Sequence, residues 1–270
     1  MKLLNVENVL KREQDIQHAQ VEYDVIKELG DKIVSYAILS HRWEVEVTYK
    51  EMIGLVKTDE QKREEVRNRV GYQKIIKSCE QARRDGYEWL WSDTCCIDKR
   101  SSAELSEAIN SMYQWYQDAQ VCYGYLNDVE GPTFPTKKNH ETYAKSDGWP
   151  EWFTRGWTLQ ELIAPKQIEF FNKDWAPIGN KRHLAPVLEN ITNIPCNVLR
   201  DGLVGKRLSV AQIMSWAAYR RTTRVEDRAY SLMGLFEVNM PMVYGEGKKA
   251  FHRLQLEIIR KSNDQSIFAW

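Results

Sequence analysis

The chain has 270 residues, and its 38 basic and 38 acidic residues cancel to a formal net charge of zero. A neutral chain has no global electrostatic attraction to nucleic acid or to an anionic membrane, which argues against both as partners. The first residues lack the apolar run of a signal peptide, and no stretch reaches the roughly eighteen apolar residues of a membrane helix, so we predict a soluble, cytoplasmic protein.

The first predicted strand covers Ile33 to Ser40, a short apolar and partly β-branched run that follows Gly30. The polar sequence His41-Arg42-Trp43 comes directly after it. The region from about Asp59 to Arg84 is charged and has apolar residues at helical intervals, which predicts one long helix or two helices broken near Gly71.

A second buried strand is predicted over 88–93 and ends in Asp93, Thr94 and the pair Cys95-Cys96. A helix over 103–119 follows, with Ser101 or Ser102 as its cap, and a third strand covers 120–126. This alternation of strands and helices predicts a parallel sheet covered by helices. Ligands of such sheets collect at the carboxyl ends of the strands.

The polar segment 127–150 predicts a long surface loop, and a fourth strand is predicted over 167–171. Beyond Asp174 the pattern changes to helices, with Ser209 as a good cap for the second of them; they are expected at 184–190, 210–218, 227–235 and 246–262.

Between the loop and the fourth strand, Arg155-Gly156 precedes a helix that carries Trp157 and Glu161 four residues apart. That spacing places both side chains on one face, where an indole and a carboxylate can line a pocket for a cationic ring. The alternative is that Trp157 packs in the core while Glu161 is a solvated acid near the helix start.

Several other residues allow two interpretations. His41 can donate to a phosphate or ribose, act in acid–base chemistry, or only cap its loop. Asp93 can bind a ribose hydroxyl or cap a turn. A phosphate cradle at Gly245-Glu246-Gly247 is less favoured than a simple turn before a helix. The basic clusters Lys181-Arg182-His183 and Arg220-Arg221 are interpreted as solvated faces.

The five cysteines are odd in number and lack the paired spacing of a zinc site, so we expect a reducing compartment and no bound metal. A nucleophilic thiol at Cys95 or Cys96 is disfavoured, because free cysteine is usually buried and nothing beside these two obviously lowers a thiol pKa.

Three ordered blocks carry a family resemblance: Tyr36–Trp43, Trp91–Lys99 and Arg155–Glu161. Together they resemble the fungal heterokaryon-incompatibility (HET) domain, and the later segments Arg224–Leu232 and Tyr244–Gly247 are similar to that family too. The resemblance covers nearly the whole chain and implies one HET domain over 1–270. It also implies distant kinship with the Toll/interleukin-1 receptor (TIR) fold, an α/β, flavodoxin-like parallel sheet flanked by helices. That core would span about 33–175, followed by a helical extension over about 176–270.

The family resemblance implies a cell-death effector of fungal innate immunity, often the N-terminal module of a NOD-like receptor whose later domains bind nucleotide and sense ligand. The block from Trp157 to Glu161 is similar to the catalytic motif of NAD-cleaving TIR enzymes. We therefore expect an NAD glycohydrolase that is activated by clustering, with NAD as substrate and no cofactor. Glu161 would be catalytic, and the substrate-binding candidates are His41, Arg42, Trp43, Asp93 and Trp157.

Two other functions remain open on the sequence. The domain can be a non-enzymatic death-inducing module that acts by oligomerisation and recruitment, or a nucleotide-binding sensor without turnover. The enzyme hypothesis carries a geometric expectation, because His41, Arg42, Asp93, Trp157 and Glu161 would have to line one cleft.

Overall fold

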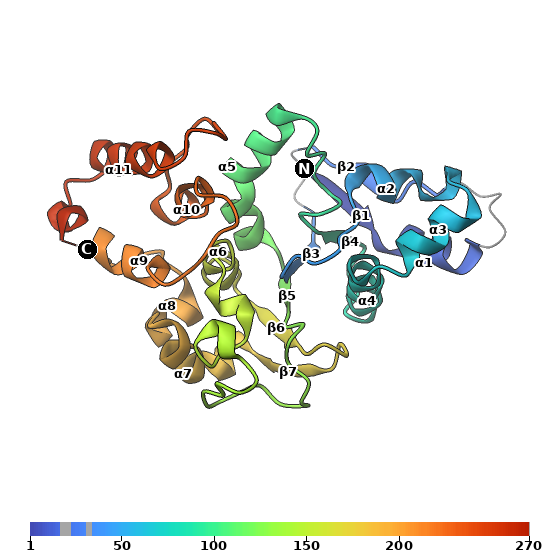
Figure 1. Cartoon of the computed structure of the whole chain (residues 1–270), viewed down its shortest axis with the longest axis horizontal. Helices are drawn as coiled ribbons and strands as arrows, with labels where there is room; N and C mark the ends of the chain where they lie inside the picture. The colour runs from blue at the N-terminus through green and yellow to red at the C-terminus, as the bar shows by residue number, and fades with distance from the viewer. Residues whose placement is uncertain (17–22, 31–33, 270) are drawn as a thin grey trace. The chain divides into compact units, whose positions relative to one another are not determined.

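The computed structural model describes residues 1–16, 23–30 and 34–269, so the first residue of the predicted strand, Ile33, lies outside the described residues. The chain divides into two compact units (Figure 1). Unit 1 contains Met1–Ala108 and Ala119–Tyr123, and unit 2 contains Ile109–Asp118 and Gly124–Trp270.

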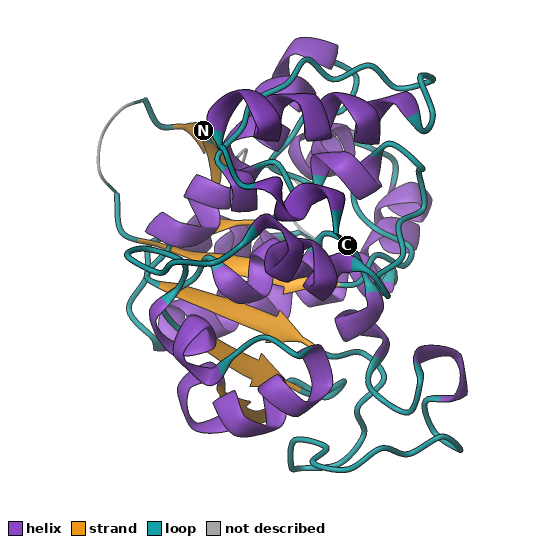
Figure 2. Cartoon of the chain, turned by 90° about the vertical axis from the view of Figure 1, so that its left-hand side faces the viewer, coloured by secondary structure: helices purple, strands orange, loops and turns teal. Residues whose placement is uncertain are grey.

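The strands form a mixed sheet in the order β2-β1-β4-β3-β5-β6-β7. Figure 2 draws strands in orange and helices in purple. Strand β3 pairs with β4 in parallel, whereas β1 is antiparallel to both β2 and β4, and β7 is antiparallel to β6. The central order β4-β3-β5-β6 corresponds to the 2-1-3-4 order of flavodoxin-like sheets. The bounds are β1 Lys2–Asn5, β2 Ile26–Glu28, β3 Tyr36–His41, β4 Trp89–Trp91, β5 Val121–Tyr125, β6 Ile168–Phe171 and β7 Pro177–Asn180.

This architecture confirms the predicted α/β class, and β3, β4, β5 and β6 confirm the four predicted strands. The sheet is mixed rather than wholly parallel, because the three strands that the sequence analysis missed are its antiparallel members. Their signals are weak: β2 has three residues, and β7 begins at Pro177 and contains Gly179 with a φ of 138°.

Unit 1 contains α1 (Val6–Asp15), α2 (Tyr49–Gly54), the 3₁₀ helix η1 (Leu55–Lys57), α3 (Glu60–Arg67) and α4 (Val70–Arg84). Helices α1 and α4 pack side by side (Figure 1). The predicted long helix is therefore two helices, and the break falls just before Gly71, at Asn68 and Arg69.

The start of α4 is capped by backbone rather than by a side chain. Its N-cap residue Arg69 makes no side-chain cap, and the N–H of Gly71 donates to the carbonyl of Val45 at 3.1 Å. This bond satisfies one of the free N–H groups that every helix start presents. It also docks the segment that carries Glu46 onto the first turn of α4.

Helix α5 (Ser102–Asp118) confirms the helix predicted over 103–119. The Ser101 hydroxyl accepts a hydrogen bond from the Glu104 N–H at 3.2 Å, so Ser101 is the cap.

Unit 2 carries most of the C-terminal helices. They are α6 (Thr158–Ile163), α7 (Lys181–Thr192), α8 (Cys196–Asp201), α9 (Val210–Ala217), α10 (Asp227–Tyr230), η4 (Gly234–Phe236), α11 (Lys249–Lys261) and η5 (Gln265–Phe268). Ser209 caps α9 in a capping box with Gln212, as predicted. The four helices predicted after Asp174 correspond to α7, α9, α10 with η4, and α11, while the short α8 was not predicted.

The segment 127–150 contains the short 3₁₀ helix η2 (Ala144–Ser146), and η3 (Glu151–Thr154) follows it. It is anchored by three buried aromatic residues, Phe134, Tyr143 and Trp149. The Phe134 ring packs edge-on against Phe170 of β6, with centroids 5.3 Å apart. The predicted surface loop is thus tied to the core of unit 2 at several points.

Both basic clusters that were interpreted as solvated contain a buried residue, so that interpretation is wrong for Lys181 and Arg220. The ammonium of Lys181 donates to two carbonyls at the end of α6. Leu162 lies within the last turn of the helix, and Pro165 lies just beyond it. A cation at a helix C-terminus satisfies free carbonyls and complements the helix dipole.

Among the helices of the described residues, none has the length and apolar character needed to cross a membrane.

Candidate functional site

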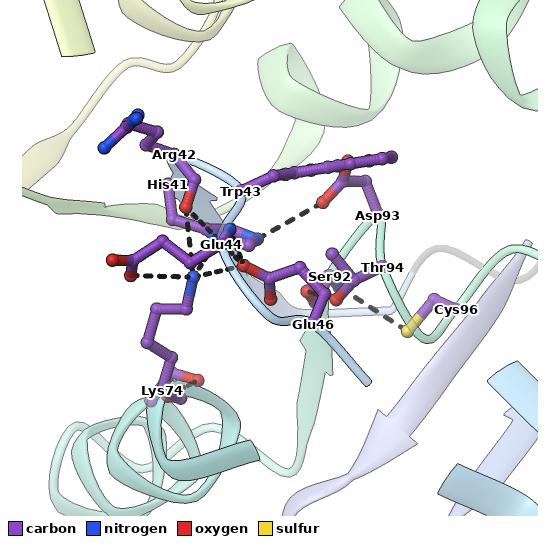
Figure 3. A network of polar contacts seen from close by, with 11 residues as sticks. His41, Arg42, Trp43, Glu44, Glu46, Lys74, Ser92, Asp93, Thr94 and Cys96 are labelled. Carbon is purple, nitrogen blue, oxygen red and sulfur yellow. Dashed lines mark hydrogen bonds and ion pairs between the residues drawn. The ribbon is translucent and has the colours of Figure 1, made fainter. Parts of the chain in front are cut away.

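Polar residues follow the parallel strands β3 and β4 at their carboxyl ends. All six residues of β3 are buried, and the strand ends at His41, while Asp93 lies two residues beyond the end of β4. Because the two strands are parallel and in register from Tyr36 with Trp89, their carboxyl ends meet at one edge. The structure therefore brings together two residues that the sequence analysis selected. With Trp43, Glu46 and Lys74 they form the His41 cluster (Figure 3).

Lys74 of α4 is the buried cation that contacts several members of the His41 cluster. Its side chain is only 2% exposed, and its ammonium donates to His41 Nδ1 at 3.0 Å, to the Arg42 carbonyl at 3.0 Å and to Glu46 Oε1. A lysine ammonium has three N–H donors, and three acceptors surround it here. The cluster thus satisfies the hydrogen-bonding capacity of a buried cation.

His41 lies between Lys74 and Asp93. Its Nδ1 is 3.0 Å from the Lys74 ammonium and 3.2 Å from the Arg42 carbonyl, and its Nε2 is 3.3 Å from Asp93 Oδ1. The His41 side chain is only 2% exposed, so the ring is shielded from solvent. His41 is thus a buried neighbour of Asp93.

Asp93 is the cluster's carboxylate nearest to solvent, with a side chain 21% exposed. Its Oδ2 accepts a hydrogen bond from the Trp43 indole at 2.8 Å, and Lys99 Nζ lies 3.6 Å from the centroid of the Trp43 ring. Burial acts to raise the pKa of Asp93, but His41, the charge of Lys99 and the Trp43 indole outweigh burial and lower the pKa to about 2. Asp93 is therefore ionised throughout the physiological range.

The low pKa of Asp93 predicts a pH-dependent stability. Compared with an aspartate of ordinary pKa, Asp93 adds about 2 kcal/mol to the free energy of unfolding above pH 4. About half of this contribution is lost by pH 3, because stability from a lowered pKa disappears as pH falls towards the pKa of the folded state. Urea unfolding of the wild type and Asp93→Asn should show a stability gap of this size at pH 7 that narrows at pH 3. A gap that stays constant with pH would contradict the assignment.

The remaining members of this edge are inert or point elsewhere. Cys95 and Cys96 are buried. A hydrogen bond with Cys96 is the main cause that raises the pKa of the Cys95 thiol, and burial is the second cause. This agrees with the expectation that neither thiol is a nucleophile. The guanidinium of Arg42 points away from the cluster in Figure 3, and Trp43 is 44% exposed.

In unit 2, Glu161 lies on α6, whose N-cap is Trp157. The residue is 7% exposed, which contradicts the alternative of a solvated acid. Trp157 itself is half-buried, and its indole is hydrogen-bonded to Asp227, which also accepts from the Tyr244 hydroxyl at 3.0 Å. Burial raises the pKa of Asp227, while these two bonds oppose the rise.

Arg220 is the buried cation associated with Glu161. Its Nε donates to the Trp216 carbonyl at 3.2 Å, and Nη1 donates at 2.9 Å both to the Arg155 carbonyl and to the Thr158 hydroxyl. These bonds hold the Arg155 turn and the first residue of α6. Burial lowers the pKa of Arg220 to about 9, and the negative charge of Glu161 opposes that shift.

The glycine turn at 245–247 binds an anion that the chain itself supplies. The N–H groups of Gly245 and Gly247 both donate to Glu226 Oε1 at 2.9 Å. Backbone hydrogen bonds, including these two, lower the pKa of Glu226. The turn is therefore occupied by a carboxylate, and the less favoured phosphate-cradle interpretation is not needed.

Sequence analysis did not select four residues of these sites: Glu46, Lys74, Arg220 and Asp227. Lys74 had a detectable signal, since it lies on the buried stripe of α4 with Gly71, Ile75, Ser78 and Ala82. A lysine within an apolar stripe indicates a buried partner. The expectation that the residues of unit 1 and unit 2 line one cleft remains a prediction. No group of three or more His, Cys, Asp and Glu residues able to hold a metal occurs in the described part of the chain.

The fold and these motifs agree with the comparisons to known proteins. The family of heterokaryon incompatibility proteins (HET) matches residues 36–147, a range that contains the whole His41 cluster, and a domain of unknown function (DUF8212) matches residues 249–270. The chain is a HET-domain protein.

The similarity extends to a curated protein, the vegetative incompatibility protein HET-E-1 of Podospora anserina. The two are 46% identical over 235 residues, which cover 84% of this chain and 16% of that relative. The chain thus corresponds to a small part of a much longer protein. No solved structure matches it.

Proposed function

We propose that this HET domain is a cell-death effector of fungal heterokaryon incompatibility and that, when clustered, it cleaves NAD with Glu161 as the catalytic carboxylate. Membership of the HET family and the similarity to a vegetative incompatibility protein support the biological role. The resemblance of the Trp157–Glu161 block to the motif of NAD-cleaving TIR enzymes supports the chemistry.

The observation that carries the chemistry is the burial of Glu161 on a short helix that Arg220 holds by hydrogen bonds at its start. Loss of nicotinamide from NAD develops positive charge on the ribose in an oxocarbenium-like transition state. A carboxylate shielded from water stabilises such a charge more strongly than a solvated one. The charge of Arg220 interacts with that of Glu161.

The other selected residues have matching roles in this proposal. Trp43 and Trp157 offer indole faces for a base or the nicotinamide ring, Arg42 offers a guanidinium for phosphate oxygens, and Asp93, oriented by His41, offers an acceptor for a ribose hydroxyl. NAD is the substrate, and the reaction needs no resident cofactor.

Clustering is the proposed activation step. The chain matches only 16% of its longer relative, and the NOD-like receptor organisation implied by the family would place nucleotide-binding and sensor domains after this one. Assembly of such receptors in the cytoplasm would raise the local concentration of the effector domain.

The test is nicotinamide release from NAD by the domain fused to an inducible oligomeriser. Wild type should release nicotinamide on clustering, and Glu161→Gln, which keeps the shape but removes the charge, should lose at least about 100-fold in rate, in line with the loss of one charge-stabilising group. Glu130→Gln makes the same chemical change on a side chain that is 75% exposed and should retain full activity.

The competing function predicts a different pattern. If Glu161 only pairs with Arg220, the clustered wild-type domain will leave NAD intact while it still kills cells, and the recruiting module becomes the correct description. Circular dichroism and thermal unfolding of each variant separate loss of chemistry from loss of folding.

A further inference from the structure

The guanidinium of Arg220 has an unused donor in a buried place. Arg220 is 8% exposed, and while Nε and Nη1 make three hydrogen bonds, Nη2 has no partner among the residues that the structure describes. Buried polar groups are nearly always satisfied, and an unpaired charged donor is costly. An unfilled donor on a buried cation therefore indicates a missing acceptor.

Arg220 lines a small pocket in unit 2 that holds further donors. The pocket has a volume of about 20 Å³, enough for one oxygen-sized group inside, and it is partly open. Its polar wall contains Arg220, Thr222, Arg228 and Ser231, and its apolar wall includes Met214 and Phe251.

Two of these polar side chains are also uncommitted. Neither the Ser231 hydroxyl nor the exposed Arg228 guanidinium makes a hydrogen bond or an ion pair with any residue within 1–16, 23–30 or 34–269. Both residues belong to the segment after Arg224, and Ser231 is 2% exposed. The pocket thus presents a buried cation, a buried hydroxyl and an exposed cation, and no carboxylate is among its lining residues.

The backbone wall of the pocket keeps this space open. A Cβ atom at Gly156 would lie 2.5 Å from Thr222 Cγ2 and 3.3 Å from the Ser231 hydroxyl. Only glycine allows the chain to pass so close to both. The carboxylates of Glu226 and Asp227 do not compete for the donors, because they are bound by the 245–247 turn and by Tyr244 with Trp157.

We propose that this pocket binds a phosphate-type oxyanion, with one oxygen held by Arg220 Nη2 and the Ser231 hydroxyl and with Arg228 closing the entrance. The volume admits one oxygen, and the opening leaves the remainder of the anion towards the exposed guanidinium. The uncommitted guanidinium of Arg228 is suited to such a ligand, because the planar fork of an arginine bonds two phosphate oxygens. The proposal does not depend on cleavage of NAD.

Inorganic phosphate is the first probe, titrated calorimetrically into the whole domain at constant ionic strength against sodium chloride. Arg228→Ala should weaken phosphate binding about tenfold, the expected loss of a charge-assisted contact. Ser231→Ala should weaken it less. Arg221→Ala is the matched control, because Arg221 is an exposed arginine of the neighbouring turn that does not line the pocket; its affinity should stay within about twofold.

The result also separates two sources of the ligand. ADP binding that exceeds phosphate binding and is equally sensitive to Arg228→Ala assigns the pocket to the phosphate of a nucleotide, whereas equal binding assigns it to free phosphate. Absence of phosphate binding to the folded wild type, or an equal loss in Arg228→Ala and Arg221→Ala, would overturn the proposal.

Discussion

Replacing Lys74 by methionine should lower the free energy of unfolding by about 3–5 kcal/mol, the usual cost of removing one partner from a buried charged group. Three acceptors share this ammonium, and the substitution removes this donor from each of them: Glu46 Oε1, the Arg42 carbonyl and His41 Nδ1. Methionine fills nearly the same volume, so the loss reports the charge and not a cavity. Urea unfolding followed by tryptophan fluorescence measures it.

The matched control is Lys77→Met on the same helix. Lys77 has a side chain 47% exposed, and its ammonium pairs with Glu80 at 3.0 Å. An exposed pair of this kind contributes at most about 0.5 kcal/mol. Equal effects of the two substitutions would show that Lys74 does not organise the His41 cluster.

Replacing Gly71 by alanine should also destabilise the fold, although alanine is the better helix former by about 1 kcal/mol. A Cβ at this position would lie 2.5 Å from the Glu46 Cα and 2.6 Å from the Val45 carbonyl oxygen. Both are backbone atoms that cannot rotate away, so the segment must move. We expect a net loss of about 2 kcal/mol, since overpacking against a fixed neighbour outweighs helix propensity.

Gly54→Ala provides the comparison for that prediction. Gly54 is the last residue of α2, and nothing lies within 4 Å of its would-be Cβ. This variant should be as stable as the wild type or more stable by up to about 1 kcal/mol. If Gly71→Ala behaves in the same way, the close approach of residues 45 and 46 to α4 is incorrect.

The positions of His41 and Asp93 could be predicted because their signal is local. Each follows a short buried strand, and the alternation of strands and helices indicates that the two strands are parallel. The structure confirms the strands and the meeting of the two residues at one edge. The mixed character of the sheet escaped prediction, since its antiparallel members are short and carry little pattern.

The buried cations show where sequence reasoning reaches its limit. Lys181 and Arg220 stand in short basic clusters, which usually lie on the surface, yet each is held by carbonyls of an element distant in sequence. Such partners are defined only by tertiary packing. Lys74 differs, because its place within the apolar stripe of α4 gave a sign of burial.

For Glu161, helical spacing alone favoured the solvated acid, and the resemblance to a family selected the pocket instead. The burial of Glu161 agrees with that selection, because a carboxylate is rarely buried in a protein unless it has a polar partner or a functional role. The charge of Arg220 interacts with that of Glu161. The Glu161→Gln substitution tests whether Glu161 also has a catalytic role.

The proposed function requires that the clustered domain cleaves NAD with the Glu161 carboxylate as its catalytic group. The most direct measurement follows NAD content and viability together in cells where the domain is clustered by an added inducer. In wild-type and Glu130→Gln cells the NAD content should fall before membrane integrity is lost, whereas Glu161→Gln cells, with equal amounts of folded domain, should keep both. Cells that die with their NAD intact would contradict the account.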